Sequence, residues 1–473
     1  MTDEVRPMLT TKWAQYADWT RLLPQHMKSQ ARRIGRLLLL GFALRIVLLP
    51  LFGGEDAVTT AWISTTLMAK GQLILSNDPA PIFYLHALIF AIFRPIYPAT
   101  IFNRFVSQTA FTPPEFFQIS ILREPGIGIL LALLKLPYLL FDLSTAILLL
   151  WLIRNPQAAV RAFTIWLFNP VVLYVTYVFG QFDIVAVFFI VLAFYYQQQA
   201  RRNATLLALS LAILVKAFAI MIVPFFLVLY LDKERGLYER AKEFLRVAVA
   251  SVTPFALQFL IAVSQPVFYE SANYALSGDH MNGFFGTAIY NRGKPGVPFV
   301  QGLLTFIGYS ARLPTFSPIP DVIYLLPMSY LIFFVGWAFL HPKDADKLWN
   351  ATVGVFLLIY SFSLFHPQWF LWVQPFLIAL VAREGKRFAY LYAGVVTLFF
   401  VYIWWWDSLL TTFLLVPSVP AAVGWPGPMT LLNSAGLPTE LILNLARSAF
   451  SALCLAILFL TLRKDWLPSW IRD

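Results

Sequence analysis

Four groups of polar and ionisable side chains lie at the ends of apolar runs in this chain, or just beyond them. They are Glu55-Asp56 directly after Gly53-Gly54, Gln181 and Asp183 in a Phe-Gly-Gln-Phe-Asp stretch, Lys216, and His366 with Gln368 in a Phe-His-Pro-Gln-Trp stretch. An ionisable group at apolar depth in a membrane is costly, so such residues are functional candidates by default. A carboxylate can accept a proton, whereas lysine and histidine can stabilise developing negative charge. The alternative role for each is a structural hydrogen bond, or a side chain that snorkels to the interface.

The composition excludes a soluble protein. Of the 473 residues, 59% are hydrophobic and only 12% are charged, whereas a soluble domain carries about 25% charged residues. The apolar runs are continuous and do not alternate with polar residues, which excludes a β-barrel. The single cysteine, Cys454, excludes an internal disulfide framework and a cysteine-rich metal site. We therefore expect an all-α integral membrane protein.

Twelve apolar runs are candidate membrane spans. They lie near residues 35–52, 126–153, 158–176, 183–199, 203–217, 218–231, 247–264, 321–340, 350–365, 369–382, 388–406 and 440–462. At about 1.5 Å per residue, 203–217 and 218–231 each cover about 21–22 Å of a hydrocarbon core about 30 Å thick. These two runs form either a hairpin that does not fully cross the membrane or a single span.

The distribution of Lys and Arg decides between these alternatives. If the N-terminus is cytoplasmic, the segments on that side hold 24 of the 35 Lys and Arg residues, and the outer loops 53–125, 265–320 and 407–440 hold only seven. This is the positive-inside pattern. Because the basic segments 201–202 and 232–246 must lie on the same side, the chain crosses the membrane an even number of times between them. The pattern predicts about twelve transmembrane helices with both termini in the cytoplasm. The net charge of +11 then reflects this topology rather than nucleic-acid binding.

Residues 1–34 are polar and basic and do not resemble a cleavable signal peptide. We expect a cytoplasmic segment that either is disordered or contains a helix lying on the membrane surface.

The long outer loops are expected to carry most of the function. In loop 53–125, residues 56–70 predict a short helix that ends at Gly71. The 13-residue apolar run 82–94 lies between two prolines and suits an interfacial helix better than a span. Loop 265–320 is rich in Gly, Pro, Tyr and Asn, which is typical of an ordered or ligand-gated loop.

The sequence lacks the motifs of several enzyme classes. The sequence contains no GxxxxGK[ST] phosphate-binding loop, no HExxH zinc motif and no GxSxG nucleophile elbow. None of the loops is long enough for the soluble α/β domain that an enzyme using ATP or a nucleotide sugar normally has. Any chemistry is therefore expected to use a lipid-borne substrate on the outer leaflet.

Several stretches together resemble one enzyme family. They are Glu55-Asp56 with Trp62 and Gly71 following, KLPYLLFDLSTAILLLWLIR (135–154), FNPVVLYVTYVFGQFDIVAVFFIVLAF (168–194), LALSLAILVKAFAIMIVPFFLVLY (207–230) and HPQWFLWVQPF (366–376). In order, spacing and predicted membrane side they resemble the polytopic C-type (GT-C) glycosyltransferases. These enzymes use polyprenyl-phosphate sugars as donors and include prokaryotic relatives of the dolichyl-phosphate-mannose-dependent mannosyltransferases. The resemblance divides the chain into the segment 1–34, a GT-C-like transmembrane catalytic module over 35–382, and C-terminal helices with a basic cytoplasmic tail over 383–473.

The resemblance implies an inverting hexosyltransferase, with mannose favoured, in the cell membrane. Its partners would be a polyprenyl-phosphate sugar donor, a lipid-linked or glycan acceptor at the extracytoplasmic face, and membrane lipids. Asp56 takes the role of general base, with Glu55 as the alternative carboxylate. The candidates for binding donor phosphate or substrate are Lys216, Arg292, Lys294, His366, Gln368, Gln181, Asp183 and Asp78. The family mechanism needs no cofactor, and since phosphate leaves without protonation, one carboxylate suffices and metal independence is expected.

Two other functions remain open from the sequence. A secondary transporter or lipid flippase also suits many spans, a short hairpin and buried charge, although no repeat relates 37–240 to 247–462. A non-catalytic subunit of a lipid-glycan assembly is the third interpretation.

Overall fold

The computed structural model describes residues 23–73, 79–108, 115–231, 236–264, 310–312, 322–340 and 347–466. Asp78, Arg292 and Lys294, which the sequence proposes as site residues, lie outside the described residues. The described elements are helices, apart from the short antiparallel strands β1 (Ser310–Arg312) and β2 (Val322–Tyr324). The chain is an all-α integral membrane protein, as its composition predicts.

Each predicted span coincides with helical structure. Five helical segments are both long and apolar enough to cross a membrane: α7 (Ile127–Leu152), α8 (Pro156–Leu167) continued by α9 (Pro170–Leu173) and η4 (Tyr174–Val178), α13 (Leu237–Val263), α19 (Lys386–Ile403) continued by η7 (Trp404–Leu410), and α21 (Thr439–Trp466). Shorter helices occupy the other runs: α2 (Ala31–Leu48), α10 (Asp183–Gln198), α11 (Arg202–Val215), η5 (Ala217–Ile222) with α12 (Val223–Tyr230), α16 (Leu325–Leu340), α17 (Lys347–Phe362), and η6 (Pro367–Val373) with α18 (Gln374–Glu384). The number of crossings stays a prediction.

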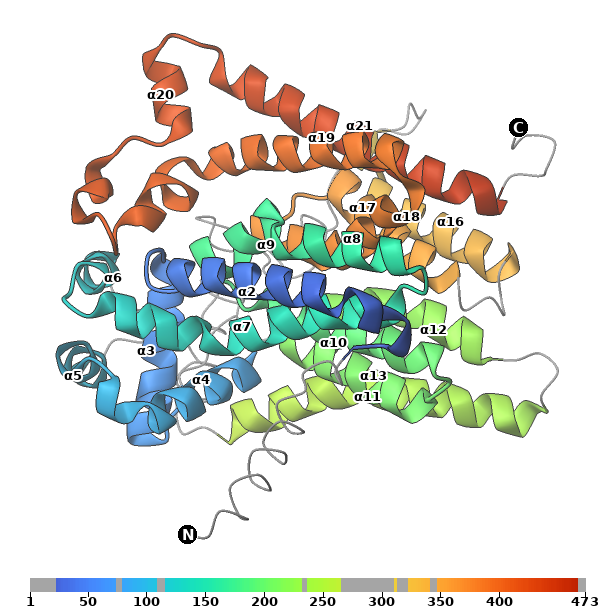
Figure 1. Ribbon diagram of the computed structural model, residues 1–473, viewed down its shortest axis with the longest axis horizontal. Helices are drawn as coiled ribbons and strands as arrows, with labels where there is room; N and C mark the ends of the chain where they lie inside the picture. Colours follow the sequence, from blue (N-terminus) through green and yellow to red (C-terminus); the bar gives the residue numbers. More distant parts are fainter. Residues whose placement is uncertain are drawn as a thin grey trace, which may run out of the picture.

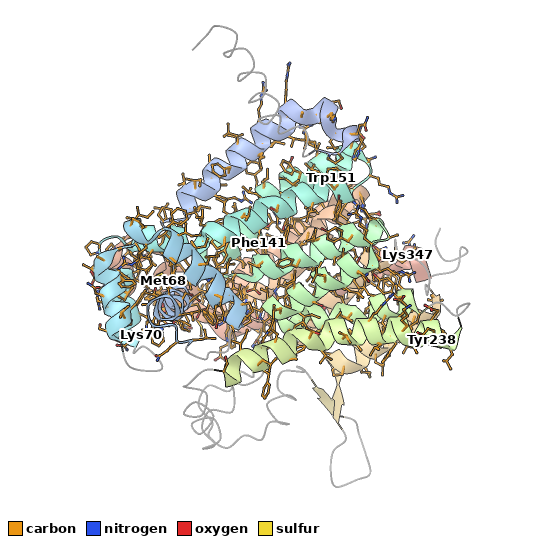
Figure 2. The ribbon with its side chains drawn as sticks, turned by 90° about the horizontal axis from the view of Figure 1, so that it is seen from below. Met68, Lys70, Phe141, Trp151, Tyr238 and Lys347 are labelled. Carbon is orange, nitrogen blue, oxygen red and sulfur yellow. The ribbon has the colours of Figure 1, made fainter. Side chains whose placement is uncertain are left out.

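Most of these helices run along the longest axis of the molecule, and the helices of the first outer loop gather at one end (Figure 1). Figure 2 shows Met68 and Lys70 of that loop at this end, and Trp151, Tyr238 and Lys347 toward the other. The positive-inside pattern requires the same separation, because it assigns Lys70 to the outer side and Tyr238 and Lys347 to cytoplasmic segments. Following this predicted topology, we call the end that carries α3 the outer end.

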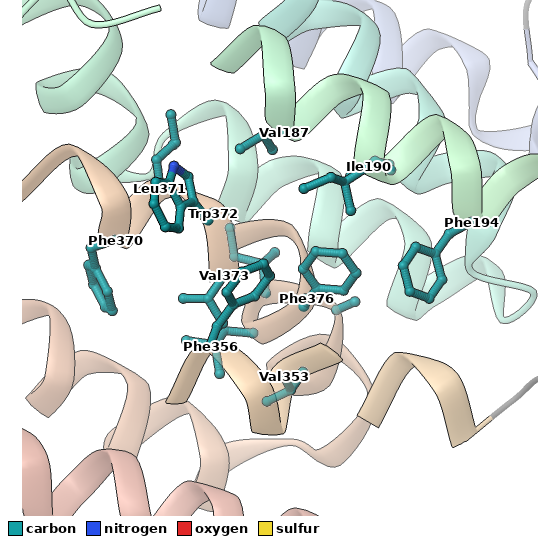
Figure 3. Packing of buried hydrophobic residues seen from close by; sticks show 14 of the residues in the cluster. Val187, Ile190, Phe194, Val353, Phe356, Phe370, Leu371, Trp372, Val373 and Phe376 are labelled. Carbon is teal, nitrogen blue, oxygen red and sulfur yellow. The ribbon is translucent and has the colours of Figure 1, made fainter. Parts of the chain in front are cut away.

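One part of the large main core lies between α10, η6, α17 and α18. Val187, Ile190 and Phe194 share one face of α10, since they are three and four positions apart. They point toward Trp372 and Phe376 in the next layer (Figure 3). The rings of Phe194 and Phe376 have centroids 5.2 Å apart at an interplanar angle of 66°, an edge-to-face geometry that adds to the area buried.

A second core holds the outer end together. It is formed by α3 (Glu55–Lys70), α4 (Ala80–Ile92), η3 (Arg94–Ile96), α5 (Ala99–Ser107) and α6 (Glu115–Leu122) against the beginning of α7. As predicted, α3 ends at Gly71, whose φ of 67° is left-handed and whose N–H bonds to the carbonyl of Leu67. The predicted interfacial helix corresponds to α4.

The C-terminal part of the chain returns to the start of the first outer loop. After η7 come η8 (Thr412–Leu415), η9 (Pro420–Gly424) and α20 (Pro428–Ser434). The N–H of Gly53 bonds to the carbonyl of Leu414 at 3.1 Å, and the Ser418 hydroxyl bonds to the carbonyl of Leu51 at 2.9 Å. The sequence resemblance had no counterpart for this segment, which nevertheless contacts the residues just before the acidic pair.

A buried ion pair joins α2, α7 and α8. The guanidinium of Arg45 pairs with Asp142, and both side chains are fully buried. Arg45 also donates to the carbonyl of Leu167 at 2.8 Å, while Tyr177 and Trp166 donate to the Asp142 carboxylate at 2.7 Å each. Both charges therefore have hydrogen-bonded partners away from water, as buried charges require.

Replacing Arg45 by Met should strongly destabilise the protein. The substitution keeps much of the side-chain volume but leaves the buried Asp142 carboxylate without its counter-charge, which typically costs about 3–5 kcal/mol. The measurement is thermal unfolding of the purified protein in detergent. Arg32→Met is the control, because Arg32 lies on the same helix and is exposed. Equal unfolding temperatures for the two variants would contradict the role given to the ion pair.

Candidate functional site

Residues 179–183 form a sharp turn between η4 and α10 and are the centre of the site. η4 is a single π-helical turn, a feature often found at functional positions. The turn needs glycine at position 180, where φ is +82°. It closes with a hydrogen bond of 2.9 Å from the N–H of Gln181 to the carbonyl of Val175. The turn therefore holds the side chains on either side of Gly180 in orientations in which they contact different parts of the protein.

Asp56 contacts this turn through Gln181. The side-chain amide of Gln181 donates to Oδ2 of Asp56 at 2.9 Å. Asp56 lies in the first turn of α3 and is exposed, whereas Glu55 is half-buried. Negative charge is favourable at a helix N-terminus. The arrangement therefore presents an oriented, solvent-accessible carboxylate.

Asp183 has a different environment from Asp56. It is fully buried at the start of α10 and accepts a hydrogen bond of 2.7 Å from the indole N–H of Trp372. The sequence placed both aspartates among groups at apolar depth. The structure buries Asp183 within the protein and leaves Asp56 exposed in the first turn of α3; the depth of both in the membrane stays a prediction. The contact with Trp372 favours an anchoring role for Asp183.

Lys216 lies at the break between α11 and η5. Its backbone is extended, with φ −151° and ψ 120°, so the chain leaves the helix there before it turns back into α12. The ammonium nitrogen lies 4.3 Å from the centroid of the Phe182 ring, which is within the range of a cation–π contact. The side chain is half-buried. A second candidate residue thus meets the same turn.

His366 contacts the turn through Phe179. Its ring stacks on Phe179 with centroids 5.9 Å apart, and Trp406 of η7 lies edge-on at 5.6 Å. Nδ1 of His366 donates to the side-chain oxygen of Gln368, at the start of η6. The imidazole is half-buried.

Of the predicted site residues within the described ranges, Gln181 and Asp183 belong to this turn, Asp56, Lys216 and His366 contact it, and Gln368 contacts His366. Phe179, Gln181, Phe182 and Asp183 each contact a different partner: His366, Asp56, Lys216 and Trp372, respectively. The described structure does not reach Arg292, Lys294 or Asp78. Within the described ranges, no group of three His, Cys, Asp or Glu side chains could hold a metal ion.

Two residues at or next to the site, Trp406 and Lys135, were not predicted from the sequence. Trp406 contacts His366 although it lies in the C-terminal part that matched no family stretch, and no sequence signal distinguished it from the adjacent Trp404 and Trp405. Lys135 is fully buried directly beneath the turn, with its Cε atom 3.4 Å from the position that a Cβ of residue 180 would occupy. Its signal was available, since it is a charged residue within an apolar run.

No family model matches this chain, and no curated protein matches it. Among solved structures, the crystal structure of ArnT from Cupriavidus metallidurans in the apo state is similar over 92% of this chain and 78% of that chain. The TM-score is 0.41 and the sequence identity is 15%. This likeness is too distant to assign a family or an activity.

Replacing Gly180 by Ala should lower stability. An Ala at φ +82° takes a left-handed conformation that costs about 1–2 kcal/mol. The new methyl group would meet Lys135 and Ala57 only at ordinary contact distances, 3.4 and 3.8 Å, so backbone strain is the expected cause. The free energy of unfolding in detergent is the measurement.

Gly424→Ala is the matched control for Gly180→Ala. Gly424 has no positive φ, and a Cβ there would meet no atom within 4 Å. If the two variants unfold at the same temperature, the turn does not require glycine.

Proposed function

We propose that this chain is an inverting glycosyltransferase that moves a sugar from a polyprenyl-phosphate donor to an acceptor at the extracytoplasmic face of the membrane. The observation that carries the proposal is the exposed carboxylate of Asp56, held by Gln181 in the same turn that Lys216 and His366 contact. A proton acceptor and candidate anion-binding groups thereby surround one short segment.

The reaction needs only one carboxylate. Asp56 takes the proton of the acceptor hydroxyl, whose oxygen attacks C1 of the sugar from the side opposite the phosphate. The bond from C1 to oxygen forms as the bond from C1 to the phosphate oxygen breaks, and the anomeric configuration inverts. The polyprenyl phosphate leaves with both bonding electrons and needs no proton, unlike the leaving group in a glycosidase.

The departing phosphate gains negative charge, so cations or hydrogen-bond donors beside it lower the barrier. We assign this role to Lys216 and His366, together with Arg292 and Lys294 of the loop 265–320. Arginine suits bidentate contacts with phosphate, and lysine acts as a compact charge. Gln368 supports His366 through their hydrogen bond, and Asp78 is the second acidic candidate from the sequence.

The finer parts of the proposal follow the sequence resemblance. The sugar is a hexose, with mannose favoured, and the acceptor is a lipid-linked or glycan molecule. The enzyme lies in the cell membrane with both termini in the cytoplasm. It acts without a cofactor or metal ion, so reversible loss of activity in EDTA would contradict this part.

Asp56→Asn should remove nearly all sugar transfer while donor binding survives. The amide keeps the shape of the side chain and cannot take the proton, and general-base assistance is typically worth about 10²–10⁴-fold. The assay measures transfer from a radiolabelled polyprenyl-phosphate hexose in proteoliposomes, with donor binding measured separately.

Glu55→Gln is the matched control and should be milder, because Glu55 is half-buried and Asp56 carries the contact with Gln181. If Asn at position 56 is tolerated and Gln at position 55 is inactive, Glu55 is the base. If both variants keep full activity, the base does not lie in this loop. Movement of substrate across the bilayer without sugar transfer would favour the transporter or flippase alternative.

Lys216→Ala should impair both donor binding and turnover. A cation on the donor phosphate stabilises the ground state and, more strongly, the transition state, so its loss should raise KM and lower kcat together. Lys70→Ala is the control, since Lys70 is an exposed lysine at the end of α3. A Lys216→Ala enzyme with the kinetic constants of the control would exclude Lys216 from the phosphate site.

A further inference from the structure

We infer that Lys135 is the positioning residue for the Asp56–Gln181 pair, an inference that rests on the proposed function of that pair. Lys135 belongs to α7 and is fully buried. Its ammonium nitrogen donates to three backbone carbonyls, those of Leu49 at 3.0 Å, Phe52 at 2.5 Å and Tyr177 at 2.7 Å. All three N–H donors of the ammonium are thereby used.

The three carbonyls belong to the two segments that lead to the site. Leu49 caps the C-terminus of α2, and Phe52 precedes Asp56 by four residues. Tyr177 lies in the π-helical turn and precedes Gln181 by four residues. One ammonium therefore fixes the distance between the segment that carries the carboxylate and the segment that carries the amide.

The packing beneath Gly180 supports this assignment. A Cβ at position 180 would lie 3.4 Å from Cε of Lys135 and 3.8 Å from Cβ of Ala57. The lysine stem and the first turn of α3 therefore both lie next to the space where a side chain of residue 180 would begin. A shift of the ammonium would be transmitted to both members of the pair.

Lys135 cannot act on the substrate directly, because it is buried and its donors are already bound. A charge at this place is also a poor choice for packing alone, since burying a cation is costly and well-packed apolar residues often stabilise a core as well. Within the described ranges, no carboxylate forms an ion pair with Lys135. The benefit that distinguishes lysine here is one atom with three donors, which can hold three chain segments at once. The role that follows is geometric alignment of the base.

The kinetic test compares Lys135→Met, which has a similar length and no donors, with Lys135→Gln, which keeps two N–H donors. A misplacement of about 1 Å at a reacting group can cost about a hundredfold in rate. We therefore expect kcat to fall at least about tenfold in Lys135→Met, less in Lys135→Gln, and the donor KM to stay within about threefold in both. Arg161→Met is the control, because Arg161 is a cation that bonds to a backbone carbonyl, that of Ala382 at 3.1 Å, at the other end of the bundle.

A second test needs no activity. Asp56→Cys and Gln181→Cys are combined in a Cys454→Ala background, which removes the natural buried cysteine. A short bifunctional thiol reagent should link the two positions efficiently when residue 135 is Lys. We expect the linked fraction to fall strongly with Met at position 135, partly with Gln, and not at all in the Arg161→Met control. All samples are taken from protein that elutes as a single species in size-exclusion chromatography.

The two tests separate the two proposals. Absence of sugar transfer in the wild-type protein would overturn the proposed function, while the cross-linking would still report on Lys135. Unchanged cross-linking and unchanged kcat in both Lys135 variants would overturn the positioning role. If Lys135→Met does not fold, Lys135→Gln decides: normal kcat and normal cross-linking in that variant would also overturn it.

Discussion

A polar group inside a bilayer must find its partner within the protein, because the lipid offers none. This constraint explains the most buried parts of the structure. Arg45 pairs with Asp142, Lys135 binds three carbonyls, and Asp183 accepts the indole N–H of Trp372. Each of these contacts joins segments that are distant in the sequence. The polar groups that the membrane makes expensive are therefore also those that fix the arrangement of the helices around the turn at residues 179–183.

The same principle governs the layer behind the site. Asn169 caps α9 by accepting from the N–H of Val171 at 2.8 Å, and its amide donates to Gln374 at 3.2 Å. The hydroxyl of Tyr392 donates to the same Gln374 oxygen at 2.6 Å. Helices from the middle and the C-terminal part of the chain are thus joined by neutral groups, which are less costly to bury than charges.

The sequence predicts the helices well because the physical signal is local. Continuous apolar runs mark the spans, and a glycine in the left-handed conformation marks the end of α3. Side chains at the turn were also found from their types alone, since charge within an apolar run is rare. The exposure of Asp56 was not predicted, because the angle at which α3 leaves the bundle depends on packing with α4, α5 and the C-terminal segment. The partners of Lys135 could not be predicted for another reason. They are backbone carbonyls, which every residue has, so the sequence does not distinguish the ones that Lys135 binds. Trp406 meets His366 only through the tertiary path of a segment rich in 3₁₀ turns.

The contact between the first outer loop and the C-terminal segment has a consequence for biosynthesis. The hydroxyl of Ser418 bonds to the carbonyl of Leu51, 367 positions earlier in the chain, and the carbonyl of Leu414 bonds to the N–H of Gly53. At about 5–20 residues per second, a ribosome needs roughly 20–70 s between these two points. During that interval Glu55 and Asp56 have already been synthesised, but the C-terminal segment that contacts the residues just before them has not. The nascent protein therefore passes through a stage in which its helices are in the membrane while the site is still incomplete.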